Sequence, residues 1–319
     1  MIQRFLYALL QNKWQDFKVI HHAELPSRDS VFGRLAKPLP EVLREALLSL
    51  GIRSLYSHQA EAVEHIRSGG TVVVATPTSS GKSLIYNMAV LEALLTTPEA
   101  RALYLFPIKA LTRDQLESLR LFLGAVGGDQ PFRAEVYDGD TTPHHRNRIR
   151  QNPPQILLSN PDMLHYALLP FHPKWESFWK SLRFVVIDEM HVYRGVFGSH
   201  VSQVFRRLIR VCRFYGSSPR FVFLSATIAN PRDLAAQLIG RSPESIQVVD
   251  RSGAPQAKRH FVFLDSEAGE TAPASGLAAK LIVRAARAGL KTIAFTPVAE
   301  GDGTGAHERS AHGSRAGLQ

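Results

Sequence analysis

The sequence of 319 residues contains a single cysteine, Cys212. One thiol excludes a disulfide framework within the chain and a cluster of cysteine ligands around a metal. Apolar residues at helical spacing before Cys212 predict that it is a small buried residue on a helix. No hydrophobic run approaches the roughly 20 residues of a membrane-spanning helix, and residues 1–10 lack the long apolar region and the cleavage site of an export signal. We therefore expect a soluble, cytoplasmic protein.

Acidic residues are outnumbered, since 38 Lys and Arg stand against 28 Asp and Glu and give a formal net charge of +10. Such an excess favours a polyanionic partner, and nucleic acid is the commonest one. The hydrophobic share of 45% is that of a globular protein. The length suffices for one large domain or two of ordinary size. The histidine pair His21 and His22 lacks a partner cluster, so we expect it at the surface.

One stretch reads as a strand, a loop of small residues and the start of a helix. Residues 71–80 form the β-branched strand and the loop, and Gly81, Lys82 and Ser83 open an apolar-periodic segment. A loop of this kind directs backbone N–H groups and the positive end of a helix at one point, which suits a polyphosphate. We expect Lys82 to reach the β- and γ-phosphates and Ser83 to bind Mg²⁺. Thr76 stands where the strict P-loop pattern has glycine.

A second chemical signal follows the apolar strand at residues 184–187. Asp188 is placed to hold Mg²⁺ directly or through water, and Glu189 to orient and deprotonate an attacking water. An acidic pair after a strand is by itself often only the start of a solvated loop. The P-loop upstream makes the catalytic interpretation stronger, because two halves of one mechanism rarely coincide.

Strand and helix patterns alternate along the chain from residue 41 onward. This alternation predicts a mostly parallel sheet covered by helices on both faces, with ligands at the carboxyl ends of the strands. The P-loop, the acidic pair and residues 225–227 all follow predicted strands. The strands are predicted at residues 71–75, 102–106, 133–137, 156–159, 184–187 and 221–224, and the helices at residues 42–50, 55–68, 84–95, 109–123, 161–169, 196–215 and 230–238.

The motifs taken together resemble a known family, the superfamily-2 helicases of the DEAD/DEAH-box group. Motifs I, II and III correspond to residues 78–83, 188–191 and 225–227, and the Q motif to Gln59. Motifs Ia and Ib correspond to residues 106–111 and 159–164. More narrowly, residues 138–141, 191–200 and 226–231 are similar to the RecQ-like-related DNA helicases whose bacterial members act in mitomycin-damage repair. The resemblance covers residues 25–295.

This resemblance implies a RecA-like P-loop NTPase fold of the α/β class that uses ATP and Mg²⁺. It implies that hydrolysis, with Lys82, Asp188 and Glu189 at the catalytic centre, drives 3′-to-5′ movement on single-stranded DNA or a 3′-tailed duplex. Gln59 has the donor and acceptor to read adenine. The family's ATP-binding positions correspond to Gln59, Thr78, Ser79, Ser80, Gly81, Lys82 and Ser83. Its coupling positions correspond to Ser225 and Thr227, and its positions near the nucleic-acid strand, where contacts fix register without reading sequence, to Lys109, Thr112 and Asn160.

The end of the chain departs from the family pattern. We expect an N-terminal extension over residues 1–40, the ATP-binding RecA-like domain over 41–255, a linker with the start of a second RecA-like domain over 256–296, and a disordered tail over 297–319. Residues 258–263, 277–288 and 291–295 read as the linker strand, first helix and first strand of that second domain. Motifs V and VI are replaced by a Gly-rich tail, which predicts a truncated or frameshifted product with weak or no unwinding; a natural flexible tail is the alternative.

Two other functions stay open from sequence. One is a non-catalytic module that binds ATP or nucleic acid without turnover, which DNA-stimulated ATP hydrolysis would exclude. The other is a P-loop kinase or GTPase, which residues 188–191 and the absence of an Asn-Lys-x-Asp guanine reader disfavour. The oligomeric state and the choice between DNA and RNA are not fixed by any pattern in the sequence.

Overall fold

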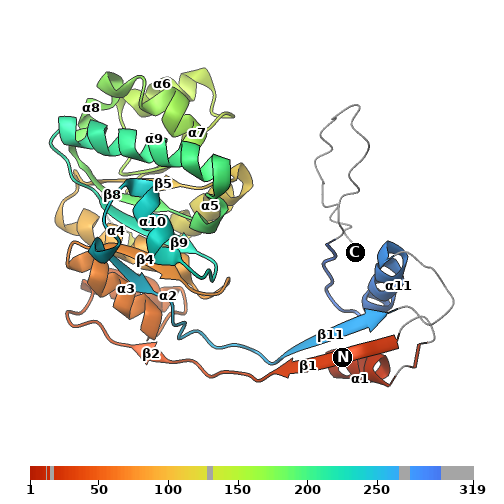
Figure 1. The fold of residues 1–319 in the computed structure, drawn as a ribbon. Coiled ribbons are helices and arrows are strands. Elements are labelled where there is room, and N and C mark those ends of the chain that lie inside the picture. The colour runs from red at the N-terminus through yellow and green to blue at the C-terminus, as the bar shows by residue number, and fades with distance from the viewer. Residues whose placement is uncertain (12, 15–17, 128–131, 266–273, 296–319) are drawn as a thin grey trace, which may run out of the picture. The chain divides into compact units, whose positions relative to one another are not determined.

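The computed structural model describes residues 1–11, 13–14, 18–127, 132–265 and 274–295. The chain divides into two compact units, Arg28–Gln256 and the combination of Met1–Ser27 with Ala257–Gln319. The larger unit, Arg28–Gln256, carries the P-loop and the acidic pair (Figure 1). Residues 297–319, predicted to be a disordered tail, lie outside the described residues.

A seven-stranded sheet forms the centre of the larger unit, in the order β10-β4-β9-β8-β5-β7-β6. Every neighbouring pair of strands is parallel, so the carboxyl ends of the strands meet at one edge. The register places Ala75 opposite Ser225 and Ile187 opposite Phe223. The strands are β4 (Thr71–Ala75), β5 (Arg101–Leu105), β6 (Ala134–Val136), β7 (Ile156–Ser159), β8 (Leu182–Ile187), β9 (Arg220–Ser225) and β10 (Ile246–Val249).

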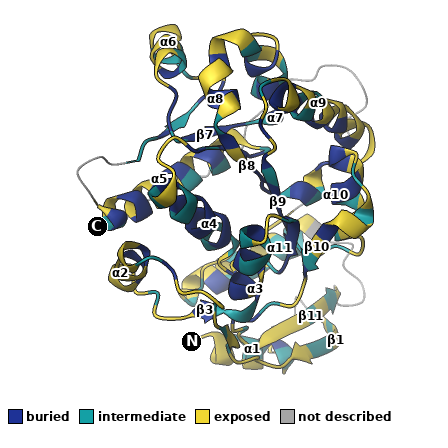
Figure 2. Cartoon of the chain, turned by 90° about the vertical axis from the view of Figure 1, so that its left-hand side faces the viewer, coloured by how far each residue is buried: buried dark blue, intermediate teal, exposed yellow. Residues whose placement is uncertain are grey.

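Side chains alternate along the strands and fill a hydrophobic core on each face of the sheet. In β4, Val72 and Val74 join one core, and Val73 and Ala75 join the other. The first core is covered by α2 (Glu41–Ser49), α3 (Ser57–Arg67), α4 (Lys82–Thr96) and α5 (Lys109–Val126). The second is covered by α6 (Pro143–Gln151), α7 (Pro161–Met163), the π-helix Leu164–Leu168, α8 (Glu176–Lys180), α9 (Gly195–Phe214) and α10 (Pro231–Ile239). The predicted parallel sheet with helices on both faces is confirmed (Figure 2).

Helix α9 shows how the sequence pattern fixes this packing. Val201, Phe205, Leu208 and Cys212 recur at helical spacing and are all buried. Cys212 is 1% exposed, and this burial raises the pKa of its thiol to about 11. The prediction of a small buried cysteine on a helix is therefore confirmed.

The smaller unit contains a pairing that sequence reasoning missed. Strand β1 (Lys18–Leu25) lies antiparallel beside β11 (Arg259–Asp265), with His22 opposite Val262 (Figure 1). The unit also contains α1 (Ile2–Leu10) and α11 (Ala274–Arg287). A strand and a helix are confirmed where the sequence predicted them, and their assignment to a linker and to the start of a second RecA-like domain stays a prediction. Among the described residues, no helix is apolar over enough length to span a bilayer.

The strand predicted at residues 291–295 is wrong. These residues have no regular backbone structure, and Ile293 and Phe295 are 82% and 92% exposed. A β-branched run becomes a strand only where a neighbouring strand accepts and donates its ladder hydrogen bonds. In the described part of the smaller unit, the only ladder is the one between β1 and β11.

Candidate functional site

The P-loop turns back over the carboxyl end of β4. Ser79 and Gly81 have left-handed backbone φ values of 61° and 76°. Left-handed residues within such a loop direct backbone N–H groups toward one concave side, where an anion is stabilised. The hydroxyl oxygens of Thr76 and Ser80 lie 2.8 Å apart and both side chains are buried, so the residue that replaces the pattern's glycine closes the loop by a side-chain hydrogen bond.

Lys82 begins α4 and folds back over this loop. Its Nζ donates hydrogen bonds of 2.9 Å to the carbonyl oxygens of Thr76 and Pro77. Burial lowers the pKa of Lys82, while the carboxylates of Glu189 and Asp188 act in the opposite direction. The predicted cation and the predicted acidic pair are therefore close enough to interact. Thr78 and Ser79 are exposed at the tip of the loop, and Ser83 is half-buried behind it.

Asp188 follows β8 and is only 8% exposed. Burial raises the pKa of its carboxyl group to about 6, and the Asp188 Oδ1 atom accepts a hydrogen bond of 2.8 Å from Glu189 N. A buried carboxylate is costly without a cation, and a divalent cation beside it would offset that cost.

The donor set at this edge fits Mg²⁺. Asp188 supplies a carboxylate and Ser83 a hydroxyl, and Mg²⁺ prefers oxygen ligands of this kind. No group of three or more His, Cys, Asp or Glu residues suited to a metal occurs in the part of the chain that the structure describes. Mg²⁺ at phosphate sites takes only one or two protein ligands and completes its shell with water and phosphate oxygens, so the small donor set agrees with that role.

His191 lies between the second and third motifs. Its Nδ1 lies 3.2 Å from Glu189 Oε2 and 3.2 Å from the backbone nitrogen of Ala226. One ring nitrogen either accepts from the Ala226 N–H or donates to Glu189, so the two contacts are alternatives. Sequence reasoning included His191 in a motif but gave it no role. Ser225, predicted to couple hydrolysis to movement, is buried next to this ring, and Thr227 is exposed.

Gln59 is 3% exposed and holds the P-loop in place. Its Nε2 donates to the carbonyl oxygen of Gly81 at 3.0 Å, and its Oε1 accepts from Tyr56 N at 2.9 Å. One N–H and one lone pair of the amide remain for another partner. A groove of about 580 Å³ passes this residue and is also lined by Phe32, Tyr56, Gly81 and Ser83. That Gln59 reads adenine stays a prediction.

The three residues predicted near nucleic acid are placed differently from one another. Lys109 is exposed at the start of α5, with its Nζ 2.8 Å from Asp140 Oδ1. Thr112 is 2% exposed and donates its hydroxyl hydrogen to the carbonyl of Ile108, so its side chain is turned away from solvent. Asn160 is half-buried and uses its Oδ1 to cap α7, accepting from Met163 N at 2.8 Å.

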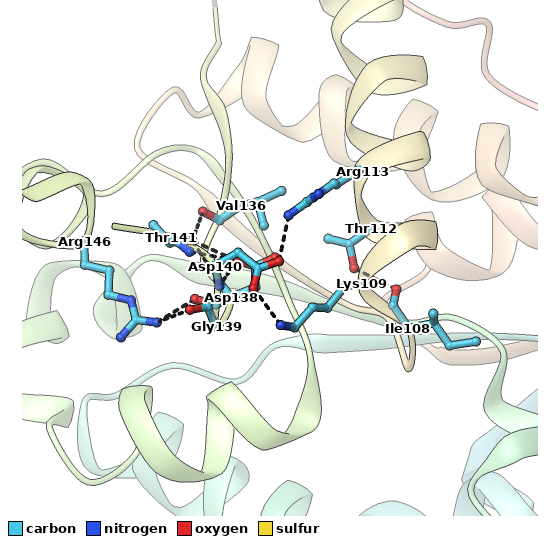
Figure 3. Close-up of polar contacts among 10 residues, drawn as sticks. All are labelled: Ile108, Lys109, Thr112, Arg113, Val136, Asp138, Gly139, Asp140, Thr141 and Arg146. Carbon is cyan, nitrogen blue, oxygen red and sulfur yellow. Dashed lines mark hydrogen bonds and ion pairs between the residues drawn. The ribbon is translucent and has the colours of Figure 1, made fainter. Parts of the chain in front are cut away.

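Asp140 lies in a hydrogen-bonded turn after β6, and its side chain faces α5. The backbone N–H groups of Asp140 and Thr141 both donate to Asp138 Oδ1, at 2.9 and 3.0 Å. Figure 3 shows Lys109 and Arg113 reaching the Asp140 carboxylate from α5, and Arg146 bonded to the backbone of the same turn from the other side. The two cations hold the pKa of Asp140 below its usual value. Sequence reasoning recognised the motif at residues 138–141 but not this ion pair.

A parallel sheet with a P-loop after β4 and an acidic pair after β8 defines a P-loop NTPase domain of the RecA-like kind. The family model described as "DEAD/DEAH box helicase" matches residues 56–234. The chain belongs to the DEAD/DEAH box helicase family.

Several proteins are similar to the chain. The uncharacterized ATP-dependent helicase YprA of Bacillus subtilis is 43% identical over 263 residues, which are 82% of this chain and 34% of YprA. The ATP-dependent helicase HRQ1 of Saccharomyces cerevisiae is 36% identical over 264 residues, which are 82% of this chain and 24% of HRQ1. The crystal structure of the DUF1998 helicase MrfA bound to DNA and AMPPNP has a TM-score of 0.82 at 39% identity, covering 89% of this chain and 39% of MrfA. The chain thus spans about a third of the length of YprA.

Proposed function

We propose that this chain is the ATP-binding part of an ATP-dependent DNA helicase that moves 3′ to 5′ and acts in DNA repair. The observation that carries the proposal is that Lys82 of the P-loop, after β4, and the buried Asp188, after β8, lie at the same edge of the parallel sheet. A cation for phosphate and a carboxylate for Mg²⁺ then lie where ligands of parallel sheets bind. The chain's family and its likeness to a helicase crystallised with DNA and AMPPNP support the same function.

Each residue at this edge has a distinct role in the proposal. Lys82 and the backbone N–H groups of the P-loop bind the phosphates of ATP, and Ser83 and Asp188 would hold Mg²⁺. When bound, Mg²⁺ would neutralise charge that develops on the transferred phosphoryl group. Glu189 orients the attacking water and accepts its proton.

The coupling of hydrolysis to movement is assigned to residues beside Glu189. Ser225 and Thr227 belong to this group, and we add His191 because its Nδ1 lies 3.2 Å from both Glu189 Oε2 and the Ala226 backbone nitrogen and can hydrogen-bond to only one of them at a time. A shift of this ring from Glu189 to the Ala226 backbone, or back, would transmit a change at the acidic pair to the end of β9. Two discrete arrangements of this kind are what a coupling element requires.

The base of the nucleotide is proposed to lie in the groove beside Gln59. Phe32 and Tyr56 stack with ring centroids 5.6 Å apart and line this groove. Aromatic faces next to an amide with a donor and an acceptor suit a purine. The proposal therefore favours ATP over GTP, because the remaining amide groups of Gln59 complement the adenine edge.

The DNA side of the proposal rests on the cations of α5. Lys109 and Arg113 converge on one carboxylate, so the pair already forms a site for an oxyanion. Phosphate contacts of this type fix the position of a strand and depend strongly on salt. Lys109 is proposed to bind the backbone directly, with Asn160 contributing its remaining amide hydrogens. The side chain of Thr112 is buried, and both its hydroxyl and its backbone N–H donate to the carbonyl of Ile108, so in this proposal Thr112 supports the start of α5 beside Lys109 and does not itself contact the strand.

Fluorescence anisotropy with a labelled 3′-tailed duplex tests the DNA side. We expect the dissociation constant of the parent chain to rise steeply with salt, and the double substitution of Lys109 and Arg113 by alanine to lower the slope of log affinity against log salt by about 2. The matched control replaces Arg210 and Arg213, exposed on α9, and should keep the parent slope if α5 forms the site. Equal slopes for the α5 variant and the parent would remove α5 from the DNA site.

A further inference from the structure

His58 is fully buried at the start of α3, next to Gln59. Its Nδ1 lies 3.1 Å from the backbone nitrogen of Gly253, and its Nε2 lies 3.0 Å from the carbonyl oxygen of Ser80. A backbone N–H can only donate, so Nδ1 accepts and the ring proton is on Nε2, which donates to Ser80. The two partners therefore select one neutral tautomer, and burial agrees with this by lowering the pKa of His58.

Gly253, the partner of His58 Nδ1, lies in a pair of hydrogen-bonded segments, residues 28–31 and 253–256. We call these two segments the connecting pair. Arg28 and Gln256 exchange two backbone hydrogen bonds of 2.8 Å, and Val31 N donates to Gly253 O at 2.8 Å. The larger unit begins at Arg28 and ends at Gln256. The chain therefore passes from one unit to the other at two points, next to Arg28 and next to Gln256, and both points adjoin the connecting pair.

The connecting pair packs against the first turn of α3 without spare room. A Cβ atom on Gly253 would lie 2.3 Å from Ser57 Oγ and 2.4 Å from Val31 O. A Cβ atom on Gly33, just past the pair, would lie 2.8 Å from Ala60 Cβ. Ser57 N donates to Val31 O at 2.8 Å. Because close-packed groups transmit displacement instead of absorbing it, the start of α3 and the connecting pair move together.

Ser80, the partner of His58 Nε2, belongs to the P-loop. His58 binds the carbonyl of Ser80, and Gln59 binds the next carbonyl, that of Gly81. Ser80 is itself buried and bonded to Thr76. Two successive residues of α3, His58 and Gln59, thus bind two successive carbonyl groups of the P-loop. Of these two residues, only His58 also has a hydrogen bond to the connecting pair among the described residues.

We propose that His58 is a positioning residue that couples nucleotide in the P-loop to the order of the connecting pair. Both of its hydrogen bonds are required, one to Ser80 and one to Gly253. This inference rests on the proposed function, because it needs a nucleotide in the P-loop. It adds to that function a route by which the nucleotide state reaches the segments that join the two units.

Two substitutions separate the two bonds of His58. His58→Asn places an amide oxygen near the position of Nδ1 and keeps an acceptor for Gly253. His58→Gln extends an amide nitrogen toward the position of Nε2 and keeps a donor for Ser80. His65→Gln, on the same helix with a partly exposed side chain that pairs with Glu61, is the matched control. Because each substitution removes one bond, either folded variant alone tests the proposal.

The readout is amide hydrogen exchange at residues 28–31 and 253–256, with and without AMPPNP and Mg²⁺, beside calorimetric binding of AMPPNP to the same samples. In the parent and the His65→Gln control we expect nucleotide to slow exchange at these amides by tenfold or more. In both His58 variants we expect the AMPPNP dissociation constant to stay within about threefold of the parent while the nucleotide-dependent change in exchange disappears.

Other results would contradict either the coupling role of His58 or the proposed function. A parent that binds AMPPNP without any change in exchange, or a folded His58 variant that keeps the full change, overturns the coupling role of His58 and leaves the proposed function intact. A parent that fails to bind AMPPNP overturns the proposed function and the coupling together.

Discussion

The carboxylate of Asp140 lies 2.8 Å from Lys109 Nζ, which is the cation proposed to bind a DNA phosphate. Its other oxygen lies 2.8 Å from Arg113 Nη2. A protein carboxylate thus occupies the partners that DNA would use, and DNA has to displace it. The hydrogen bonds to Asp138 fix the backbone of the turn that presents this carboxylate to α5.

Removing this charge should strengthen DNA binding. An exposed ion pair is weak and is screened by salt, so Asp140→Asn should tighten binding of a single-stranded oligonucleotide only about two- to fivefold at low salt, with the difference vanishing at high salt. Fluorescence anisotropy over a salt series measures this. Asp114→Asn removes an exposed charge from α5, the helix that carries Lys109 and Arg113, and serves as the control. Equal affinities for the two variants would show that only net charge matters.

Substitutions of Asp188 and of Glu189 should have different effects on ATP affinity. Glu189→Gln should keep ATP affinity within a few-fold, because Glu189 is proposed to act on water, whereas Asp188→Ala should lose the Mg²⁺-dependent part of the affinity. Calorimetric titration with ATP in Mg²⁺ and in EDTA gives both values. If the two variants weaken binding alike, the proposed division between metal ligand and general base is wrong.

His58 should make stability depend on pH below neutrality. Its folded pKa lies below the ordinary 6.5, chiefly through burial and in part through the Lys82 ammonium, and Tyr56 stacks on its ring. Between the folded and unfolded pKa values the unfolded chain binds the extra proton, so stability is fully present above pH 6.5 and is lost as pH falls.

Urea unfolding at pH 7 and pH 5.5 measures this dependence. The parent should lose more free energy of unfolding over this interval than His58→Asn, which cannot titrate there, and the difference should not exceed about 1.4 kcal/mol per pH unit. The comparison cancels the other histidines of the chain. Identical losses in the two proteins would show that His58 stays neutral in the unfolded chain as well, or is protonated in both states.

Much of the larger unit could be predicted because its signals are local. The β-branched run at Thr71–Ala75 and the apolar run before Asp188 are buried on both sides in a parallel sheet, and such strands are readable from a few consecutive residues. The succession of strand, small loop and Lys82 likewise needs no distant information. That is why the P-loop and the acidic pair lie where the sequence predicted them.

The missed features depend on residues far apart in the chain. Strand β1 has no regular alternation of exposed and buried residues, and its partner β11 begins at Arg259. The segment at residues 291–295 has strand-forming residues but gains no partner among the described residues. The Lys109–Asp140 pair and the His58–Gly253 contact also arise only once the chain has folded. No spacing rule in a single sequence reports such contacts.

The burial of Thr112 shows a second reason why the sequence did not predict every residue of the site. Lys109 and Thr112 are three residues apart on α5, so a motif places them together. Residues three apart lie on the same side of a helix, but Lys109 stands at the exposed start of α5, whereas Thr112, one turn further on, is covered and bonds its hydroxyl to Ile108. A motif identifies which residues cluster in sequence, and the packing of the helix decides which of them reach a ligand.

Lys82 is proposed to bind the phosphates of ATP, and calorimetric titration of Mg·ATP into the parent and Lys82→Ala tests this role. Lys82 contacts loop carbonyls only by hydrogen bonds, so the variant should keep its fold and melting temperature within a few degrees. Charge-assisted hydrogen bonds contribute about 1.5–3 kcal/mol, so its dissociation constant should rise about 10- to 100-fold. Lys180→Ala, an exposed lysine on α8, should bind ATP like the parent. Equal affinity of Lys82→Ala and the parent would show that Lys82 does not bind the phosphates and that residues 76–83 are not a nucleotide site.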